Sequence, residues 1–177
     1  MSLSVLDQSP IPEGSTSGDA LRNSIDLARL AEDLGYARYW VAEHHGTPAL
    51  ACASPEVLIG PIAAATSRIR VGSGGVMLPH YSPLKVFESF RMLSGLYPGR
   101  IDLGIGRAAG TSSKVALALQ RDRRQRAPDD FREQLDELLS YLGIESRAEP
   151  RAEPSLLGSS PQSAIWAAEL GLPYVFA

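Results

Sequence analysis

The sequence has 177 residues, of which 44% are hydrophobic, and its formal net charge is −3. This hydrophobic share is large enough to bury a core, which excludes an intrinsically disordered chain. A weakly acidic chain also lacks the positive field that attracts proteins to nucleic acid or to anionic lipid, so we expect neither partner.

The cellular compartment is indicated by cysteine usage and by the first residues. The lone cysteine, Cys52, cannot form an internal disulfide, and the start MSLSVLDQ lacks the basic flank and apolar stretch of a signal peptide. No segment approaches the roughly 20 consecutive apolar residues that a membrane helix needs. We therefore expect a soluble, cytoplasmic protein whose partner is a small molecule.

The chain repeats one unit: a short apolar run of strand-forming residues, a loop rich in Gly, Ser and Pro, and a longer stretch with helical spacing. Serine followed by proline marks the start of two helices, and Gly35, Gly143 and Gly171 are placed to end three. In chain order, the predicted elements are a strand at 3–8, a helix at 19–34, a strand at 38–42, a helix at 54–66, a strand at 69–72, a helix at 82–95, a strand at 100–104, a helix at 129–142, a strand at 155–158, a helix at 161–170 and a strand at 174–177.

Residues 144–154 interrupt this pattern with a tandem Arg-Ala-Glu-Pro copy, which is typical of a solvated linker. Pro150 and Pro154 predict a shortened fifth strand. Six βα units fit either a doubly wound sheet or part of a (β/α)8 TIM barrel, which typically needs about 250 residues. We expect one α/β domain over 1–177. As part of a barrel it has open strand edges, so either further chain or a second copy covers them, and we expect a homo-oligomer.

Polar residues and glycines gather where the predicted strands end. Because parallel βα folds form their ligand sites at the carboxyl ends of the strands, these positions predict an active-site edge. They are Asp7-Gln8-Ser9, Glu43-His44-His45, Ser73-Gly74-Gly75, Gly106-Arg107 and Ser159-Ser160.

Two of these positions have both a functional and a structural interpretation. Neighbouring strand residues point to opposite faces, so only one of His44 and His45 is expected to face the site, which disfavours a metal pair. That histidine serves either as a general base or donor, or as a structural hydrogen-bonding group. Gly74 and Gly75 either let a flat ligand approach the backbone or form a flexible turn.

Two further positions suit an anion. Arg107 has the planar fork that binds phosphate, although a surface pair with a carboxylate explains it equally well. Ser160 and Ser163 stand at a predicted helix start, where hydroxyl and backbone N–H groups bind an anion or cap the helix.

Three motifs in this order resemble those of the bacterial luciferase-like flavin monooxygenase family. They are Glu-His-His at 43–45, V-G-S-G-G-V-M-L-P at 71–79 and P-G-R-I-D-L-G-I-G-R at 98–107. The resemblance extends from Leu3 to about Leu142 and resumes in LLGSSPQSAIWAAELGLPYVFA. It implies a TIM-type barrel, here truncated to about six βα units without the seventh and eighth strands.

The resemblance also implies a reaction and the residues that support it. Members use reduced FMN from a separate flavin reductase to activate O2 and oxidise an aldehyde or similar small organic substrate. His44 matches the catalytic histidine, Gly74 and Gly75 match a non-prolyl cis peptide against the flavin ring, and Arg107, Ser160 and Ser163 match phosphate ligands. Gly106 replaces a cysteine of the luciferases, so no thiol role carries over. Two alternatives remain: a deazaflavin (F420)-dependent hydride transferase on the same barrel, and a non-catalytic oligomeric fragment.

Overall fold

The computed structural model describes residues 2–107, 112–120, 129–144 and 150–176. Strands and helices alternate along these residues, as the sequence predicts. The elements are β1 (Ser4–Asp7), α1 (Ser17–Asp33), β2 (Arg38–Val41), α2 (Pro55–Ala65), β3 (Arg70–Met77), the 3-10 turn η1 (Leu78–His80), α3 (Pro83–Leu96), β4 (Ile101–Gly106), α4 (Ser113–Leu119), α5 (Phe131–Ile144), β5 (Glu153–Gly158), α6 (Pro161–Leu170) and β6 (Tyr174–Phe176).

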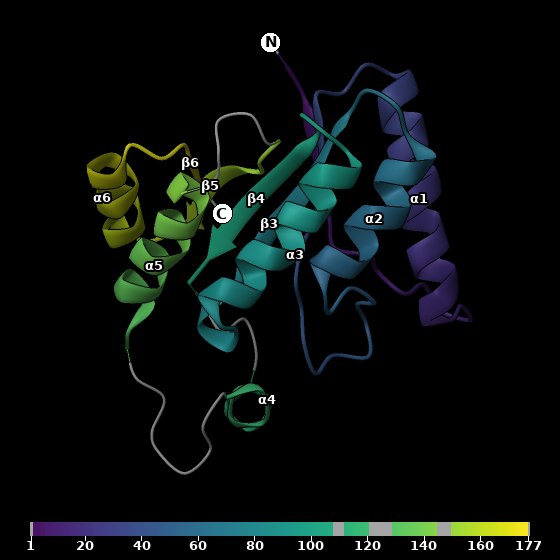
Figure 1. Cartoon of the computed structure of the whole chain (residues 1–177). Coiled ribbons are helices and arrows are strands. Elements are labelled where there is room, and N and C mark those ends of the chain that lie inside the picture. The colour runs from purple at the N-terminus through teal and green to yellow at the C-terminus, as the bar shows by residue number, and fades with distance from the viewer. Residues whose placement is uncertain (1, 108–111, 121–128, 145–149, 177) are drawn as a thin grey trace.

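The six strands form one parallel sheet in the order β1-β2-β3-β4-β5-β6. Helices α1, α2, α3, α5 and α6 lie along one face of this sheet (Figure 1). Strict sequential order with one-sided helices is the arrangement of a barrel, whereas a doubly wound sheet reverses its strand order and carries helices on both faces. The sheet is a curved, incomplete (β/α)8 barrel with six of the eight strands, which confirms the predicted truncated barrel.

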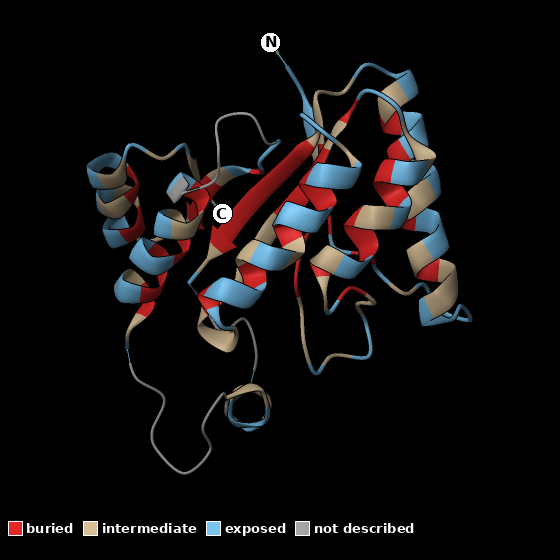
Figure 2. Cartoon of the chain, in the orientation of Figure 1, coloured by how far each residue is buried: buried red, intermediate tan, exposed pale blue. Residues whose placement is uncertain are grey.

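The hydrophobic core lies between the sheet and its helices. Buried residues line the helix faces that are turned toward the strands, and the outer helix faces are exposed (Figure 2). Strand residues of the helix-covered face, such as Val71, Leu103 and Leu156, are completely buried. On the concave face, Asp102 accepts hydrogen bonds from Arg70 Nε (2.8 Å) and Trp40 Nε1 (2.8 Å), so its buried charge is compensated. The core therefore lies on the helix-covered side of the sheet.

Several boundaries differ from the predicted ones. β3 continues through the glycines to Met77 with a register shift between Ser73 and Val76, because it pairs with β4 beyond the irregularity. Gly143 does not stop a helix, since α5 continues to Ile144. The capping box of Thr16 and Asp19 starts α1 earlier than predicted. Helix α4 was not predicted. The sequence Arg-Asp-Arg-Arg-Gln-Arg at 121–126, whose basic charge suggests a solvated surface and not a binding site, lies outside the described residues.

The predicted linker over 144–154 extends too far, because its last residues belong to a strand. Residues 145–149 lie outside the described residues, but β5 begins at Glu153 and includes Pro154, so the strand is not shortened to Ser155. Pro154 pairs with Leu103 of β4, and β6 joins only from Leu156 onward. A proline is tolerated there because it has a neighbouring strand on one side only.

The strands β1 and β6 form the two edges of the sheet. Leu6 of β1 and Phe176 of β6 are 53% and 78% exposed. Within the described residues, no helix is both long and apolar enough to cross a membrane. That 1–177 forms a single domain and that the chain self-associates stay predictions.

Candidate active site

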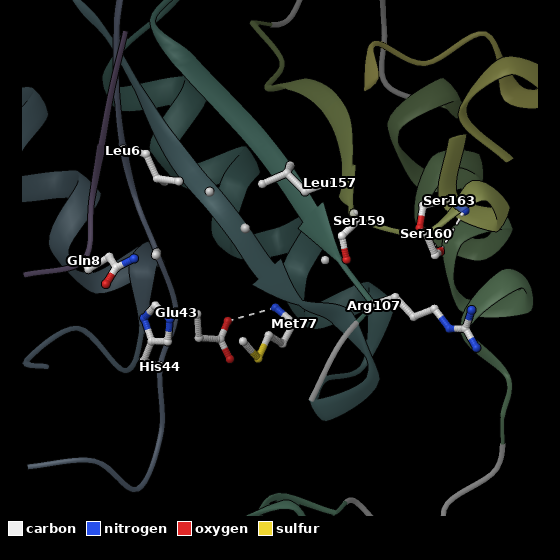
Figure 3. A pocket seen from close by; sticks show the side chains of 15 residues that line it. Leu6, Gln8, Glu43, His44, Met77, Arg107, Leu157, Ser159, Ser160 and Ser163 are labelled. Carbon is white, nitrogen blue, oxygen red and sulfur yellow. Dashed lines mark hydrogen bonds between the residues drawn. The ribbon is translucent and has the colours of Figure 1, made fainter. Parts of the chain in front are cut away.

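A cavity of about 560 Å³ lies at the carboxyl end of the strands, as the pattern of strand ends predicts. Figure 3 shows side chains from β1, the β2 end, β3 and the segment after β5 around it. Both apolar and polar side chains line it. The lining residues are Leu6, Gln8, Ala42, Glu43, His44, Gly74, Gly75, Met77, Gly106, Arg107, Leu157, Gly158, Ser159, Ser160 and Ser163.

The β1 end is fixed by a buried carboxylate. Asp7 accepts hydrogen bonds from the backbone N–H of Ser9 (2.7 Å) and from the hydroxyl of Tyr39 (2.7 Å). Ser9 adopts a left-handed conformation with φ of 50°, which lets its N–H reach back to Asp7. The Ser9 hydroxyl also lies 2.8 Å from that of Ser24 in α1. These contacts fix the backbone on both sides of Gln8, which lines the cavity.

The β2 end is organised around Glu43, whose side chain is 1% exposed. Its Oε1 lies 2.6 Å from His45 Nε2 and accepts a hydrogen bond from the Tyr81 hydroxyl (2.9 Å), and its Oε2 accepts one from the Met77 N–H (2.9 Å). Three partners therefore compensate the burial of this carboxylate. They also tie the end of β2 to the end of β3.

His44 and His45 have different surroundings, as predicted, but both follow β2, which ends at Val41, so strand alternation is not the cause. His44 lines the cavity, and its backbone N–H donates to the carbonyl of Cys52 (3.0 Å). Its Nδ1 is buried and has no hydrogen-bond partner among the described residues. His45 instead contacts Glu43 and the ring of His80, with ring centroids 5.9 Å apart. Of these two histidines, His44 is therefore the one that faces the cavity, and it is also the one with a buried nitrogen that lacks a partner among the described residues.

Gly74 and Gly75 lie within β3 beneath the cavity, and the peptide bond that joins them is cis, as the resemblance implies. A Cβ on Gly74 would lie 2.5 Å from a methyl group of Leu6, and a Cβ on Gly75 would lie 2.8 Å from the carbonyl oxygen of Gly104. Gly75 has no room for a side chain, because the atom that a Cβ would meet is backbone, whereas the Leu6 methyl group beside Gly74 ends a flexible side chain that can move. The backbone is therefore bare on this wall of the cavity.

The opposite side of the cavity carries Arg107, Ser160 and Ser163 (Figure 3). The two serine hydroxyls lie 2.9 Å apart at the start of α6, and Ser160 Oγ also accepts from the Ser163 N–H (3.4 Å). Gly158 faces them, and a Cβ there would lie 2.3 Å from Ser163 Oγ. A guanidinium, two hydroxyls and a helix N-terminus are a donor set that suits a phosphate.

Burial raises the pKa of two groups near Glu43, the Cys52 thiol and the Tyr81 hydroxyl. Burial is the main cause that raises the pKa of the Cys52 thiol to about 12, and the charges of Asp7 and Glu43 add to it. Burial, followed by the charge of Glu43, raises the pKa of the Tyr81 hydroxyl. These groups stay protonated at neutral pH, so Tyr81 remains a hydrogen-bond donor to Glu43.

The structure brings all six predicted site residues to one cavity: His44, Gly74, Gly75, Arg107, Ser160 and Ser163. Their roles stay predictions. The sequence did not single out Met77, Leu157 or the role of Glu43, although the Glu43 position at a strand end marked it for inspection. Among the described residues, no group of three or more His, Cys, Asp or Glu side chains could hold a metal ion.

The sequence is similar to known proteins over its whole length. A family model described as luciferase-like monooxygenase matches residues 1–177. The protein YwcH of Bacillus subtilis (strain 168), called uncharacterized, is 52% identical over 100% of this chain and 57% of its own length. A luciferase-like monooxygenase of Escherichia coli (strain K12) is 46% identical over 100% and 55%. The N-acetyl-S-alkylcysteine monooxygenase of Bacillus subtilis (strain 168) is 46% identical over 99% and 56%. The chain thus spans about half the length of the curated relatives it matches.

Solved structures share the fold. The crystal structure of apo-MsnO8 superposes with a TM-score of 0.90 at 48% identity, over 99% of this chain and 55% of that one. The oxygenating constituent of 3,6-diketocamphane monooxygenase from Pseudomonas putida, in complex with FMN, gives 0.81 at 20% identity over 99% and 57%. An F420-dependent secondary alcohol dehydrogenase gives 0.60 at 18% identity over 92% and 54%. The last two show a common fold alone.

Proposed function

The chain belongs to the luciferase-like monooxygenase family, and from this premise we propose that it is the FMN-binding part of a flavin-dependent monooxygenase. The reaction we propose uses reduced FMN from a separate reductase, O2 and a small organic substrate. The observation that carries the proposal is the meeting of Arg107, the two serines and the bare glycine backbone in one cavity.

The described residues fit FMN in shape and in chemistry. A cavity of about 560 Å³ lies within the range of about 300–1,000 Å³ that is usual for small-molecule sites. Arg107, Ser160 and Ser163 would hold the phosphate at one end. The glycine backbone at 74–75 would lie against the flat ring system, because glycine has no Cβ to hold a ring away from the backbone. Leu6, Met77 and Leu157 would contribute apolar contacts.

Reduced FMN, when bound, supplies the electrons that activate O2. The part of His44 is to present its imidazole to the reacting end of the cavity, at the end opposite Arg107 (Figure 3). Its buried Nδ1 lacks a partner among the described residues, so a ligand hydrogen bond there would satisfy it. Glu43 acts indirectly, because it holds the β2 end that carries His44.

The substrate class rests on the relatives. The relative named N-acetyl-S-alkylcysteine monooxygenase supports a small sulfur-containing substrate rather than a polymer. The alternative is an F420-dependent hydride transfer, which the fold also accommodates in a relative of low identity. The donor set at Arg107 suits either phosphate-bearing cofactor. Cofactor titration therefore decides between the two.

The test is an anaerobic titration of the 177-residue chain with reduced FMN, reduced riboflavin and F420. We expect FMN to bind more tightly than riboflavin, which lacks the phosphate, and more tightly than F420. Arg107→Ala should weaken FMN binding about 10- to 100-fold and leave riboflavin binding unchanged, since it removes charge-assisted hydrogen bonds to the phosphate. His44→Ala should largely spare FMN binding.

Arg29→Ala is the matched control, because Arg29 is an exposed arginine on α1 that does not line the cavity and that pairs with Asp26 in an exposed salt bridge. Equal affinities for FMN and riboflavin would contradict the proposed phosphate site. Preferential binding of F420 would replace the monooxygenase with the hydride transferase.

A further inference from the structure

Arg107 is supported from behind by an aromatic side chain. Its guanidinium carbon lies 5.4 Å from the ring centroid of Trp166 in α6. Trp166 is not among the described residues that line the cavity. A guanidinium over the face of an indole is attracted by the ring quadrupole, and tryptophan is the strongest of the aromatic partners. The contact therefore restrains Arg107 without occupying the face that would meet a ligand.

Helix α6 brings the indole and one serine to the same side. Ser163 and Trp166 are three residues apart, which places them on one helix face. Ser163 is buried at the cavity, whereas Trp166 is half-buried. Helix α6 therefore fixes the position of the Ser163 hydroxyl relative to the Trp166 ring that contacts Arg107.

Trp166 is itself fixed by the core. Its ring packs against that of Phe131, the first residue of α5, with centroids 5.7 Å apart and an angle of 31° between the planes. Phe131 is 3% exposed and belongs to the core cluster. The indole is therefore held between the core and the guanidinium, and it cannot rotate away without breaking an aromatic contact.

The ionic partner of Arg107 is a weaker restraint. Asp129 Oδ1 lies 3.8 Å from the guanidinium, and the Asp129 side chain is 85% exposed. Solvent screens such a pair, so it contributes little to the position of the arginine. The contact with Trp166 restrains Arg107 more firmly, because the Trp166 ring is itself packed against Phe131 of the core.

We infer that Trp166 is a positioning residue for phosphate binding: the indole, stacked on Phe131, orients the Arg107 guanidinium toward the anion site formed with Ser160 and Ser163. This inference rests on the proposed function. Loss of the indole face leaves a flexible, half-exposed arginine that must be ordered each time a phosphate binds, so affinity falls for phosphate-bearing ligands alone.

The first experiment is anaerobic equilibrium dialysis of reduced FMN and reduced riboflavin against the full chain and its variants. We expect Trp166→Leu to weaken FMN binding about two- to fivefold and riboflavin binding not at all, from the usual strength of an exposed cation–π contact. Trp166→Phe, which keeps an aromatic face, should restore most of the loss. In the Arg107→Ala background, Trp166→Leu should have no further effect. Ile165→Ala, an exposed change on the same helix, is the control.

The second experiment reads the contact without a flavin. The chain has two tryptophans, so 5-fluorotryptophan labelling gives two ¹⁹F resonances, and Trp166→Phe assigns them. Arg107→Ala should shift the Trp166 resonance and leave that of Trp40 in place, and inorganic phosphate should shift the Trp166 resonance in the wild type alone. A Trp166 resonance that Arg107→Ala does not shift would overturn the inference.

The binding results separate the two proposals. A preference for FMN over riboflavin that survives Trp166→Leu unchanged, or additive effects of Trp166→Leu and Arg107→Ala, would overturn the inference and leave the proposed function standing. The absence of any FMN preference in the wild type would overturn both.

Discussion

The two sides of the cavity are built in opposite ways. On the β2–β3 side, Glu43 is 1% exposed and each of its oxygens is engaged, by His45, Tyr81 and the Met77 N–H. On the β4–β6 side, the side chain of Arg107 is 41% exposed and has only a distant carboxylate and an aromatic ring as described partners. The first side is satisfied by the protein, whereas the second keeps donors available for a ligand.

This difference teaches which residues support the site and which bind. A buried carboxylate that loses its partners destabilises the fold, because its desolvation is no longer compensated. Buried partners that lose the carboxylate are left without an acceptor and destabilise the fold for the same reason. An exposed arginine is hydrated in the free protein and can exchange water for phosphate at little cost. Changes on the first side should therefore lower the stability of the protein, and changes on the second should lower affinity.

The strongest test of this contrast is Glu43→Ala. It leaves the Tyr81 hydroxyl, His45 and the Met77 N–H without their acceptor, and we expect the free energy of unfolding to fall by about 3 kcal/mol. Glu43→Gln, which keeps the shape and one acceptor, should lose less. Urea unfolding measures both, with Glu13→Ala in the exposed β1–α1 loop as the control. Equal losses at Glu43 and Glu13 would break the contrast.

A smaller effect is expected at the glycine wall between the two sides. In Gly75→Ala, the new Cβ would lie 2.8 Å from the carbonyl oxygen of Gly104, which is backbone and cannot rotate away. We expect a loss of about 2 kcal/mol in urea unfolding. In the matched variant Gly106→Ala, the nearest atom to the new Cβ is 3.6 Å away, so the loss should stay below about 1 kcal/mol. A greater loss for Gly106→Ala would show that this wall is not close-packed.

The smallest effect concerns a second carboxylate, Glu32, which ties α1 to the start of β3 outside the cavity. Burial opposes its charge, but the backbone N–H groups of Ile69, Arg68 and Ser67 outweigh burial and lower its pKa to about 2. Because the folded pKa lies below the usual 4.5, the stabilisation is present above about pH 4.5 and is lost as the pH falls toward 2.

For Glu32→Gln we expect a loss of at most about 1 kcal/mol at pH 7, since Glu32 is only half-buried and solvent screens its charge. The difference from the wild type should shrink between pH 5 and pH 2.5, as Glu32 becomes protonated and resembles glutamine. Urea unfolding at several pH values measures it. A difference that grows on acidification would contradict the assigned direction of the pKa shift.

Local signals predicted most of the fold. Serine-proline starts placed α2 and α3, and Gly171, with φ of 64°, ends α6 as predicted. The errors arose where tertiary contacts extend an element. β3 and β4 continue past their predicted ends because each pairs with its neighbour through Met77 and Gly106, and β5 includes Pro154 because β4 pairs with it. Such pairing depends on the neighbouring strand, which periodicity in one segment does not reveal.

By itself, the sequence determined the order of parallel βα units and the polar strand ends, because period, caps and turns depend on residues close together in the chain. It therefore indicated where His44, Arg107 and the two serines would meet. Only the tertiary structure decided what holds them there. Glu43 reaches partners 34 and 38 positions away, and Arg107, which follows β4, rests on an indole from α6. These contacts depend on how the sheet curves and how α6 packs, which no local spacing specifies.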